Sequence, residues 1–216
     1  MRLHVFSPLA ALGCVALLAQ TPPSQPSPPL AHSNVLGFSY SLPSDWEIVD
    51  AEPALPAAKQ QAEQTAGSED EKKGIACAEV TLTARHGNPP NVVVVVALPF
   101  DCYGQTLQEK DLPGFGAGAA EGLKQKFNIA DTVYGSYTLG SHGFWIERAM
   151  GAPKNKPGAE ETIEIACSVL KKAAVCWMTM AVDADGLRAF EDGVVTLDGE
   201  PAAALVPADA FAKKPS

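Results

Sequence analysis

A run of five consecutive valines, Val92–Val96, is the feature that most limits the fold of this 216-residue chain. A strand that is apolar on both sides must be covered on both faces, so the run predicts a central strand between two layers. Extended patterns recur at residues 35–42, 46–49, 75–85, 92–98, 132–139, 144–150, 161–170 and 173–182, and helical patterns at 55–66, 111–127 and 187–197. We therefore expect one α+β domain, a central antiparallel sheet of about seven strands with helices on both faces.

Residues 1–19 have the pattern of a secretory signal peptide. Arg2 precedes an apolar run that is too short to span a bilayer, and no acidic residue occurs before Asp45. The run Leu12-Gly13-Cys14 is similar to the lipobox of bacterial lipoproteins, so lipidation of Cys14 is an alternative to plain export. We expect export, either to the periplasm or out of the cell, with plain export favoured over a lipid anchor.

Proline content sets the expected domain boundaries. Residues 20–33 form a proline-rich linker, with five prolines between Thr21 and Pro29, which cannot build a core. The folded domain is expected over residues 34–206, and residues 207–216 are expected to be a flexible tail. Residues 68–74, which are mostly charged, are expected to be a solvated loop.

Removal of the signal leaves four cysteines, an even number that indicates disulfides in an exported chain. In an antiparallel hairpin the numbers of opposed residues have a constant sum, and a turn at Lys171-Lys172 places Cys167 opposite Cys176. A turn centred between Pro89 and Pro90 likewise places Cys77 opposite Cys102. We predict these two bridges as structural, because no C-x-x-C motif occurs and the spacings do not suit zinc.

The net charge restricts the class of partner. With 16 basic and 25 acidic residues the formal charge is -9, which disfavours nucleic acid and anionic membrane surfaces. We expect an unknown protein or a small apolar ligand as partner, and no cofactor. Contact with a membrane is expected only through a lipid on Cys14.

Several motifs have the residue types of active sites without the spacing. Asp131, Ser141 and His142 supply the groups of a nucleophilic triad, but a Gly-x-Ser-x-Gly elbow is missing and a polar turn explains them. Gly114–Gly118 matches neither the Walker spacing nor the dinucleotide-binding spacing of phosphate sites. Asp183–Gly186 begins like a calcium loop, but the fifth and sixth positions are unsuitable, so an aspartate there is expected to cap a helix.

Two further groups of residues are candidates for function. Acidic residues in the second half of the chain would form an acid–base pair only if the fold brought them together, and we expect them at solvated strand ends: Glu147, Glu160, Glu161, Glu164 and Asp192. Trp145, Arg148 and Trp177 are a candidate binding surface. Core packing is the favoured interpretation for both tryptophans.

The segment Gly37-Phe38-Ser39-Tyr40-Ser41-Leu42-Pro43-Ser44-Asp45-Trp46 resembles the opening of PsbP-like domains. This fold is shared by the photosystem subunit PsbP, a eukaryotic Ran-binding import factor and bacterial envelope proteins. The resemblance implies an α/β/α sandwich over residues 35–206 and a binding or assembly role without catalysis. It carries over no site residues, and the two cysteine pairs depart from the family's pattern.

The sequence thus favours an exported, non-enzymatic envelope module for binding or assembly. One alternative is a secreted or periplasmic hydrolase-type enzyme, which would need a pocket that joins a histidine to a carboxylate and a nucleophile. The other is a lipid-anchored structural or scaffold protein.

Overall fold

The computed structural model describes residues 30–50, 52–53, 55–116, 124, 127–155 and 158–212. The strands are β1 (Leu30–Ser33), β2 (Phe38–Ser41), β3 (Glu47–Ile48), β4 (Glu79–His86), β5 (Asn91–Pro99), β6 (Phe127–Leu139), β7 (His142–Pro153), β8 (Glu161–Leu170), β9 (Ala173–Ala181), β10 (Val194–Leu197) and β11 (Ala203–Ala204). The helices are α2 (Leu55–Thr65), α3 (Glu69–Cys77), α4 (Phe100–Tyr103), the 3-10 turn η2 (Glu109–Asp111) and α6 (Ala184–Glu191). None of the helices within these residues has the length and apolar character needed to cross a bilayer.

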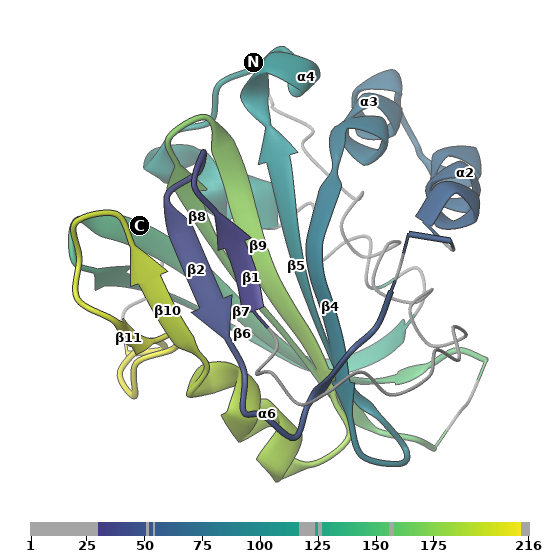
Figure 1. Cartoon of the computed structure of the whole chain (residues 1–216). Coiled ribbons are helices and arrows are strands. Elements are labelled where there is room, and N and C mark those ends of the chain that lie inside the picture. The colour runs from purple at the N-terminus through teal and green to yellow at the C-terminus, as the bar shows by residue number, and fades with distance from the viewer. Residues whose placement is uncertain are drawn as a thin grey trace.

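A seven-stranded antiparallel sheet in the order β3-β4-β5-β9-β8-β7-β6 forms the centre of the protein (Figure 1). The valine run lies in β5, between β4 and β9. Val92, Val94 and Val96 point into one core, whereas Val93 and Val95 point into the other. All five are buried, so the predicted two-sided strand is confirmed.

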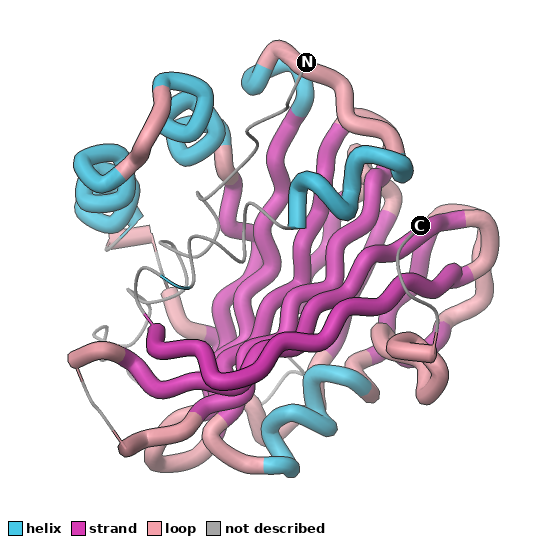
Figure 2. The backbone as a smooth tube through the Cα atoms, turned by 180° about the vertical axis from the view of Figure 1, so that it is seen from behind, coloured by secondary structure: helices cyan, strands magenta, loops and turns pink. Residues whose placement is uncertain are grey.

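Helical segments cover the face of the sheet that is turned toward the viewer in Figure 2. Phe100 and Tyr103 of α4, together with Leu112 and Phe115 of the helical segment 112–116, complete the core on this side. The segment opens the helix expected over residues 111–127. Residues 117–123 and 125–126 lie outside the described residues, and Phe127 already belongs to β6.

A second, four-stranded sheet in the order β1-β2-β10-β11 covers the opposite face together with α6 (Figure 1). The expected α+β class and seven-stranded sheet are therefore confirmed, and a small sheet joins the helix in the second covering layer. The expected helix ends early because Gly193 packs tightly: a Cβ at this position would come within 2.5 Å of the Tyr40 ring. The chain leaves α6 there, and the β-branched residues of β10 pair with β2 instead of extending the expected helix.

Both predicted disulfides are present. Cys167 and Cys176 lie opposite each other in β8 and β9, as the short Lys171-Lys172 turn predicted. Cys77 and Cys102 are also bonded, but the hairpin register that predicted them is wrong, because Arg85 opposes Val92 and a bulge interrupts the ladder.

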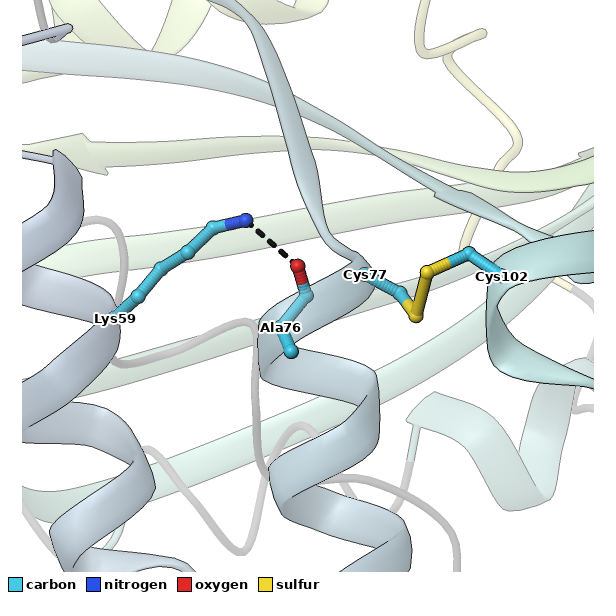
Figure 3. The surroundings of a disulfide bond; sticks show 4 residues. All are labelled: Lys59, Ala76, Cys77 and Cys102. Carbon is cyan, nitrogen blue, oxygen red and sulfur yellow. Dashed lines mark hydrogen bonds between the residues drawn. A yellow bond between two sulfur atoms is a disulfide. The ribbon is translucent and has the colours of Figure 1, made fainter.

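The Cys77–Cys102 bridge instead connects two helices (Figure 3). Cys77 is the last residue of α3, and Cys102 lies in α4, which directly follows β5. Lys59 of α2 donates a hydrogen bond to the Ala76 carbonyl oxygen at 2.9 Å, so α2 is fastened to the same end of α3.

Three expected boundaries differ from the structure. Residues 69–77 form α3 instead of a loop, because Ser68 accepts a hydrogen bond from the Glu71 N–H at 3.1 Å and the first turn is acidic. The expected linker overlaps β1, in which Ala31 is buried. The expected tail is packed as far as Ala210, which is also buried. The signal segment and Cys14 lie outside the described residues.

The register of the β6–β7 hairpin differs from the one that the expected strands imply. Strands over 132–139 and 144–150 leave a four-residue turn that pairs Leu139 with Phe144, whereas Leu139 opposes His142, a shift of two residues. Gly140 has a φ of 57°, in the left-handed region that a two-residue turn requires, and the turn is therefore tighter than the four-residue turn that was expected. A shift by two residues preserves the face on which each side chain lies.

Candidate functional site

The strand β6 forms one edge of the large sheet. Its 13 residues pair with β7, and in the described part of the chain its other side has no neighbouring strand. The two-residue turn makes Leu139 and His142 a hydrogen-bonded pair, after which bonded and non-bonded pairs alternate. This alternation directs the backbone N–H and C=O groups of Thr132, Ser136 and Thr138 away from β7.

Only one end of this edge is protected against pairing. Ala130 lies in a bulge, and the Asp131 carboxylate accepts a hydrogen bond from the outward Thr132 N–H at 2.8 Å. Charges and bulges of this kind are the usual protection of an edge strand. Residues 132–139 contain no charged residue and no proline, and Val133 and Tyr134 are 43% and 38% exposed. The region of β6 from Val133 to Leu139, here called the open edge, has no neighbouring strand on its outer side among the described residues.

A cavity of about 340 Å³ lies beside the open edge. One wall is the stretch from Ser136 to Thr138, and the other is formed by the segment 109–113, which includes Leu112 and Pro113. The Glu109 carboxylate accepts a hydrogen bond from the Gly143 N–H at 2.9 Å, which holds this segment against the hairpin. The cavity therefore has a mixed lining, with apolar side chains such as Leu112 and Pro113 beside polar groups, next to outward-pointing backbone groups.

A second hollow of about 550 Å³ follows the other end of the same strand. It is lined by residues 127–132 of β6 and by the side chains of Lys124 and Lys154. Asp131 is the single acidic residue among the described residues that line it. Two lysines and one aspartate give the described lining of this hollow a formal charge of +1.

A buried carboxyl group lies next to the open edge. Glu147 of β7 opposes Tyr134 and is only 2% exposed. Its Oε2 atom has no hydrogen-bond partner among the described residues. Burial raises the pKa of Glu147 to about 7, and the positive charge of Lys124 opposes this shift. Glu147 therefore changes its charge near neutral pH, which neither its position nor its type revealed in the sequence.

A second buried carboxyl group lies on the opposite face of the sheet. Arg148 donates hydrogen bonds to Glu164 in β8 and to Glu191 in α6, and its guanidinium lies 4.5 Å from the ring centre of Phe211. Glu164 is completely buried, and burial raises its pKa to about 7 although Arg148 opposes the shift. This network joins the sheet, α6 and the C-terminal segment, which is a structural role.

Core packing, the favoured interpretation of Trp145 and Trp177, is confirmed, and the alternative binding surface of these two residues with Arg148 is not formed. Trp145 is 2% exposed and packs in the helix-covered core, whereas Trp177 is fully buried in the other core. Each tryptophan occupies a strand position that points into a covered face. Arg148 lies on the face opposite to Trp145 and is engaged by two carboxylates.

The acidic residues do not assemble into an acid–base pair. Glu147 opposes Ile165 and Arg148 opposes Glu164, so Glu147 and Glu164 lie on opposite faces of the sheet. Both are buried, contrary to the expectation of solvated strand ends, whereas Glu160 and Asp192 are exposed.

The residues of the possible triad are also separated. Asp131 lies far along β6 from the turn that holds Ser141 and His142. Glu200 accepts hydrogen bonds from the Ser141 hydroxyl at 2.8 Å and from its N–H at 2.9 Å. These bonds, with a contribution from His142, lower the pKa of Glu200, which makes this carboxylate a weak base that fastens the turn.

The remaining motifs have structural roles. Asp183 accepts a hydrogen bond from the Gly186 N–H at 2.7 Å and caps α6, as expected. A Cβ on Gly116 would come within 2.2 Å of the Trp145 ring, so close packing explains this glycine. Over the described ranges no three His, Cys, Asp or Glu side chains gather where they could bind a metal ion.

Sequence reasoning found β6 and its apolar pattern but missed its position at the edge. That position depends on β9, which inserts between β5 and β8 and leaves β6 at the end of the order. The uncharged stretch from Thr132 to Leu139 is typical of an interior strand, because edge strands usually carry protecting charges, so it did not indicate an edge in the sequence.

No family model matches the chain, and no curated protein matches it. Among solved structures it is similar to the cyanobacterial PsbP (CyanoP) of Synechocystis sp. PCC 6803, at 10% identity and a TM-score of 0.40, over 76% of this chain and 86% of that one. It is also similar to LpqN, involved in cell envelope biogenesis of Mycobacterium tuberculosis, at 13% identity and a TM-score of 0.38, over 75% and 82%. A PsbP is thus among the similar structures, as residues 37–46 led us to expect. At these identities and TM-scores the likenesses support no statement about activity, ligand or partner.

Proposed function

We propose that this protein is an exported, non-enzymatic binding module that holds a partner polypeptide as an added strand on the open edge of β6. The observation that carries the proposal is the pair of outward backbone positions, Ser136 and Thr138, facing the 340 Å³ cavity. In strand addition, main-chain hydrogen bonds supply affinity, and pockets for alternate side chains supply specificity.

The available contacts suit a moderate affinity. Ser136 and Thr138 offer two donors and two acceptors, and each hydrogen bond contributes about 0.5–1.5 kcal/mol net. The half-exposed side chains of Val133 and Tyr134 add apolar area next to the edge. These terms together are of the size that offsets the loss of freedom when a short peptide is ordered.

Two observations support export. Two disulfides join cysteines of the folded domain, and such bridges persist in oxidising compartments. The pattern of residues 1–19 points the same way. The intact mass of the mature protein distinguishes cleavage after Ala19 from a lipid on Cys14. The proposed binding at the open edge does not depend on which of the two occurs.

The test compares two variants at one position of the edge. Ser136→Pro removes an outward N–H and places a ring where the added strand would lie, whereas the bonds to β7 come from neighbouring residues. Ser136→Ala keeps the backbone and is the matched control. Circular dichroism and thermal melting verify that both variants are folded.

Binding is measured on the mature chain with a library of fluorescent extended peptides of about nine residues. Peptides that bind are expected to protect the Ser136 and Thr138 amides from hydrogen exchange. Their affinity is expected to fall at least tenfold in Ser136→Pro and to stay within twofold in Ser136→Ala. Equal binding to the proline variant, or a ligand that fills the cavity without protecting these amides, contradicts strand addition and favours a small apolar ligand.

A further inference from the structure

The two disulfides were both expected to be structural, but they differ in their access to solvent. Cys167 and Cys176 are 0% and 1% exposed and lie in the helix-covered core. Cys102 is an exposed residue of α4, whereas its partner Cys77 is 6% exposed. A disulfide opens when a thiolate attacks one of its sulfur atoms, so the rate depends on access to that sulfur. Of the two bridges, Cys77–Cys102 is therefore the one that an external thiol can attack.

We propose that Cys102 is a site of thiol–disulfide exchange with an external dithiol, and that opening of its bridge loosens the attachment of the helix pair α2–α3. A thiolate of the dithiol attacks Cys102 Sγ, the bond between the two protein sulfurs breaks, and Cys77 leaves as a thiolate that takes up a proton. The second thiol of the dithiol then loses its proton and attacks the mixed disulfide. The products are the oxidised dithiol and the Cys102 thiol, so the bridge gains the electron pair and the protons that the dithiol loses.

The helix pair depends on this bridge because its own apolar contacts are small. The bridge links α3 covalently to α4 (Figure 3). Lys59 of α2 donates its hydrogen bond to the Ala76 carbonyl oxygen, so the position of α2 follows that of α3. Among the described side chains, the apolar cluster of the pair consists of Ala62 and Ile75, with Ala66 packed against them. Elements with few buried apolar contacts open locally at a low free energy.

The contacts that remain after exchange hold only the ends of the pair. Leu55 at the start of α2 and Ala78 after α3 pack in the helix-covered core, and β4 begins directly after Ala78. Lys73 of α3 approaches Gly104, where a Cβ would come within 3.0 Å of its ammonium nitrogen, but both residues are exposed and water competes for this contact. We therefore expect residues 56–76 to loosen, whereas β4 keeps its pairing.

The exchange site is separate from the open edge of β6. The chain after α4 forms one wall of the cavity beside Ser136–Thr138. This wall has contacts of its own, because Leu107 and Leu112 are buried in the helix-covered core and Glu109 accepts the Gly143 N–H. Opening of the bridge therefore leaves the cavity in place, and the inference does not depend on strand addition.

Selective reduction is measured on the folded, oxidised mature chain at neutral pH. Dithiothreitol serves as the dithiol, iodoacetamide labels each freed thiol, and peptide mass mapping follows the four cysteines over time. Cys77 and Cys102 are expected to be labelled at least about tenfold faster than Cys167 and Cys176. Labelling of all four cysteines at one rate, or of neither bridge while the chain stays folded, overturns the proposal.

A monothiol identifies the sulfur that is attacked. Glutathione has a single thiol, so the first exchange leaves it on one cysteine of the protein and frees the other. At short times, mass mapping is expected to find glutathione on Cys102 and the iodoacetamide label on Cys77. An equal or larger share of glutathione on Cys77 contradicts attack at Cys102.

Hydrogen exchange tests the loosening of the helix pair. After selective reduction, the amides of residues 56–76 are expected to exchange at least about tenfold faster, whereas those of β5 and β9 keep their rates. Cys77→Ala/Cys102→Ala is expected to reproduce this pattern without a reductant. Cys167→Ala/Cys176→Ala, which removes the buried bridge, is the matched control and is expected to leave exchange at 56–76 within about twofold of the parent.

The outcomes separate the two parts of the inference. Unchanged exchange at 56–76 in the selectively reduced chain refutes the loosening, even where the labelling shows that the bridge has opened. Faster exchange throughout the sheet refutes a local effect, because the bridge would then hold the whole domain together. Peptide binding at the open edge is expected to be the same before and after reduction, so a failure of strand addition does not affect this test.

Discussion

The buried carboxyl of Glu147 makes the stability of the protein depend on pH in a predictable direction. Its pKa is about 7 in the folded state against a reference of 4.5, so the folded state binds more protons than the unfolded state between these values. The contribution of Glu147 to the stability of the protein is therefore largest below pH 4.5. It falls as the pH rises from 4.5 to 7 and levels off above pH 7. Linkage at 1.36 kcal/mol per pKa unit gives a loss of about 2.5 kcal/mol between pH 5 and pH 8.

The substitution Glu147→Gln removes this titration and keeps the shape of the side chain. The change in unfolding free energy between pH 5 and pH 8 is expected to be about 2.5 kcal/mol less negative in the variant than in the parent. Glu164 also titrates in this range, but it does so in both proteins and cancels in the comparison. Urea unfolding of the oxidised mature protein at both pH values measures the difference.

Glu79→Gln is the matched control, because Glu79 is exposed on β4. The unfolding free energy of Glu79→Gln is expected to change between pH 5 and pH 8 as that of the parent does. Parallel pH dependence in the parent and in Glu147→Gln would show that Glu147 ionises freely in the folded state, which would refute its burial and its raised pKa. A steeper loss of unfolding free energy with rising pH in Glu147→Gln would refute the predicted direction of the effect.

Three further substitutions test the packing. Removal of the Cys167–Cys176 bridge by alanine at both positions is expected to cost about 2.7 kcal/mol, since the closed loop is short, and urea unfolding measures it. Gly135→Ala places a Cβ within 2.2 Å of the Ala210 carbonyl oxygen, so the C-terminal segment is expected to detach and to be cut by a protease that spares the parent. Arg148→Met leaves two carboxylates without their cation and is expected to destabilise by about 3–5 kcal/mol at pH 8 and by less at pH 5, where the Glu164 carboxyl, with its pKa of about 7, is protonated; a loss independent of pH would contradict this account.

Features with local causes were predictable from the sequence. The alternation of Val92–Val96 between two cores follows from the geometry of any strand, and the Cys167–Cys176 pair follows from a two-residue turn between patterned strands. The cap at Asp183 follows from side-chain chemistry at a helix start. None of these requires knowledge of the strand order.

Features that depend on distant pairing were not predictable in the same way. The Cys77–Cys102 pair was predicted correctly, but from a hairpin register that the structure does not have. Both cysteines lie in helices beyond the strand ends, so strand pairing does not determine their distance. Val194 and Leu197 have the spacing of a helix face in the sequence. In the structure the segment Val194–Leu197 is a strand that pairs with β2 near the start of the domain. The open edge of β6 and the burial of Glu147 likewise depend on the strand order and on what covers each face.

The pairing of β2 with β10 determines when the second core can close. The Tyr40 hydroxyl donates a hydrogen bond to the Phe190 carbonyl oxygen, 150 residues later in the chain. At a synthesis rate of about 5–20 residues per second, those residues take about 8–30 s to appear. During that interval the face of Val93 and Val95 lacks α6 and the C-terminal covering strand β10. A nascent chain thus leaves part of one side of its sheet uncovered until synthesis is nearly complete, and a product cut short before Ala184 lacks both α6 and β10 on that side.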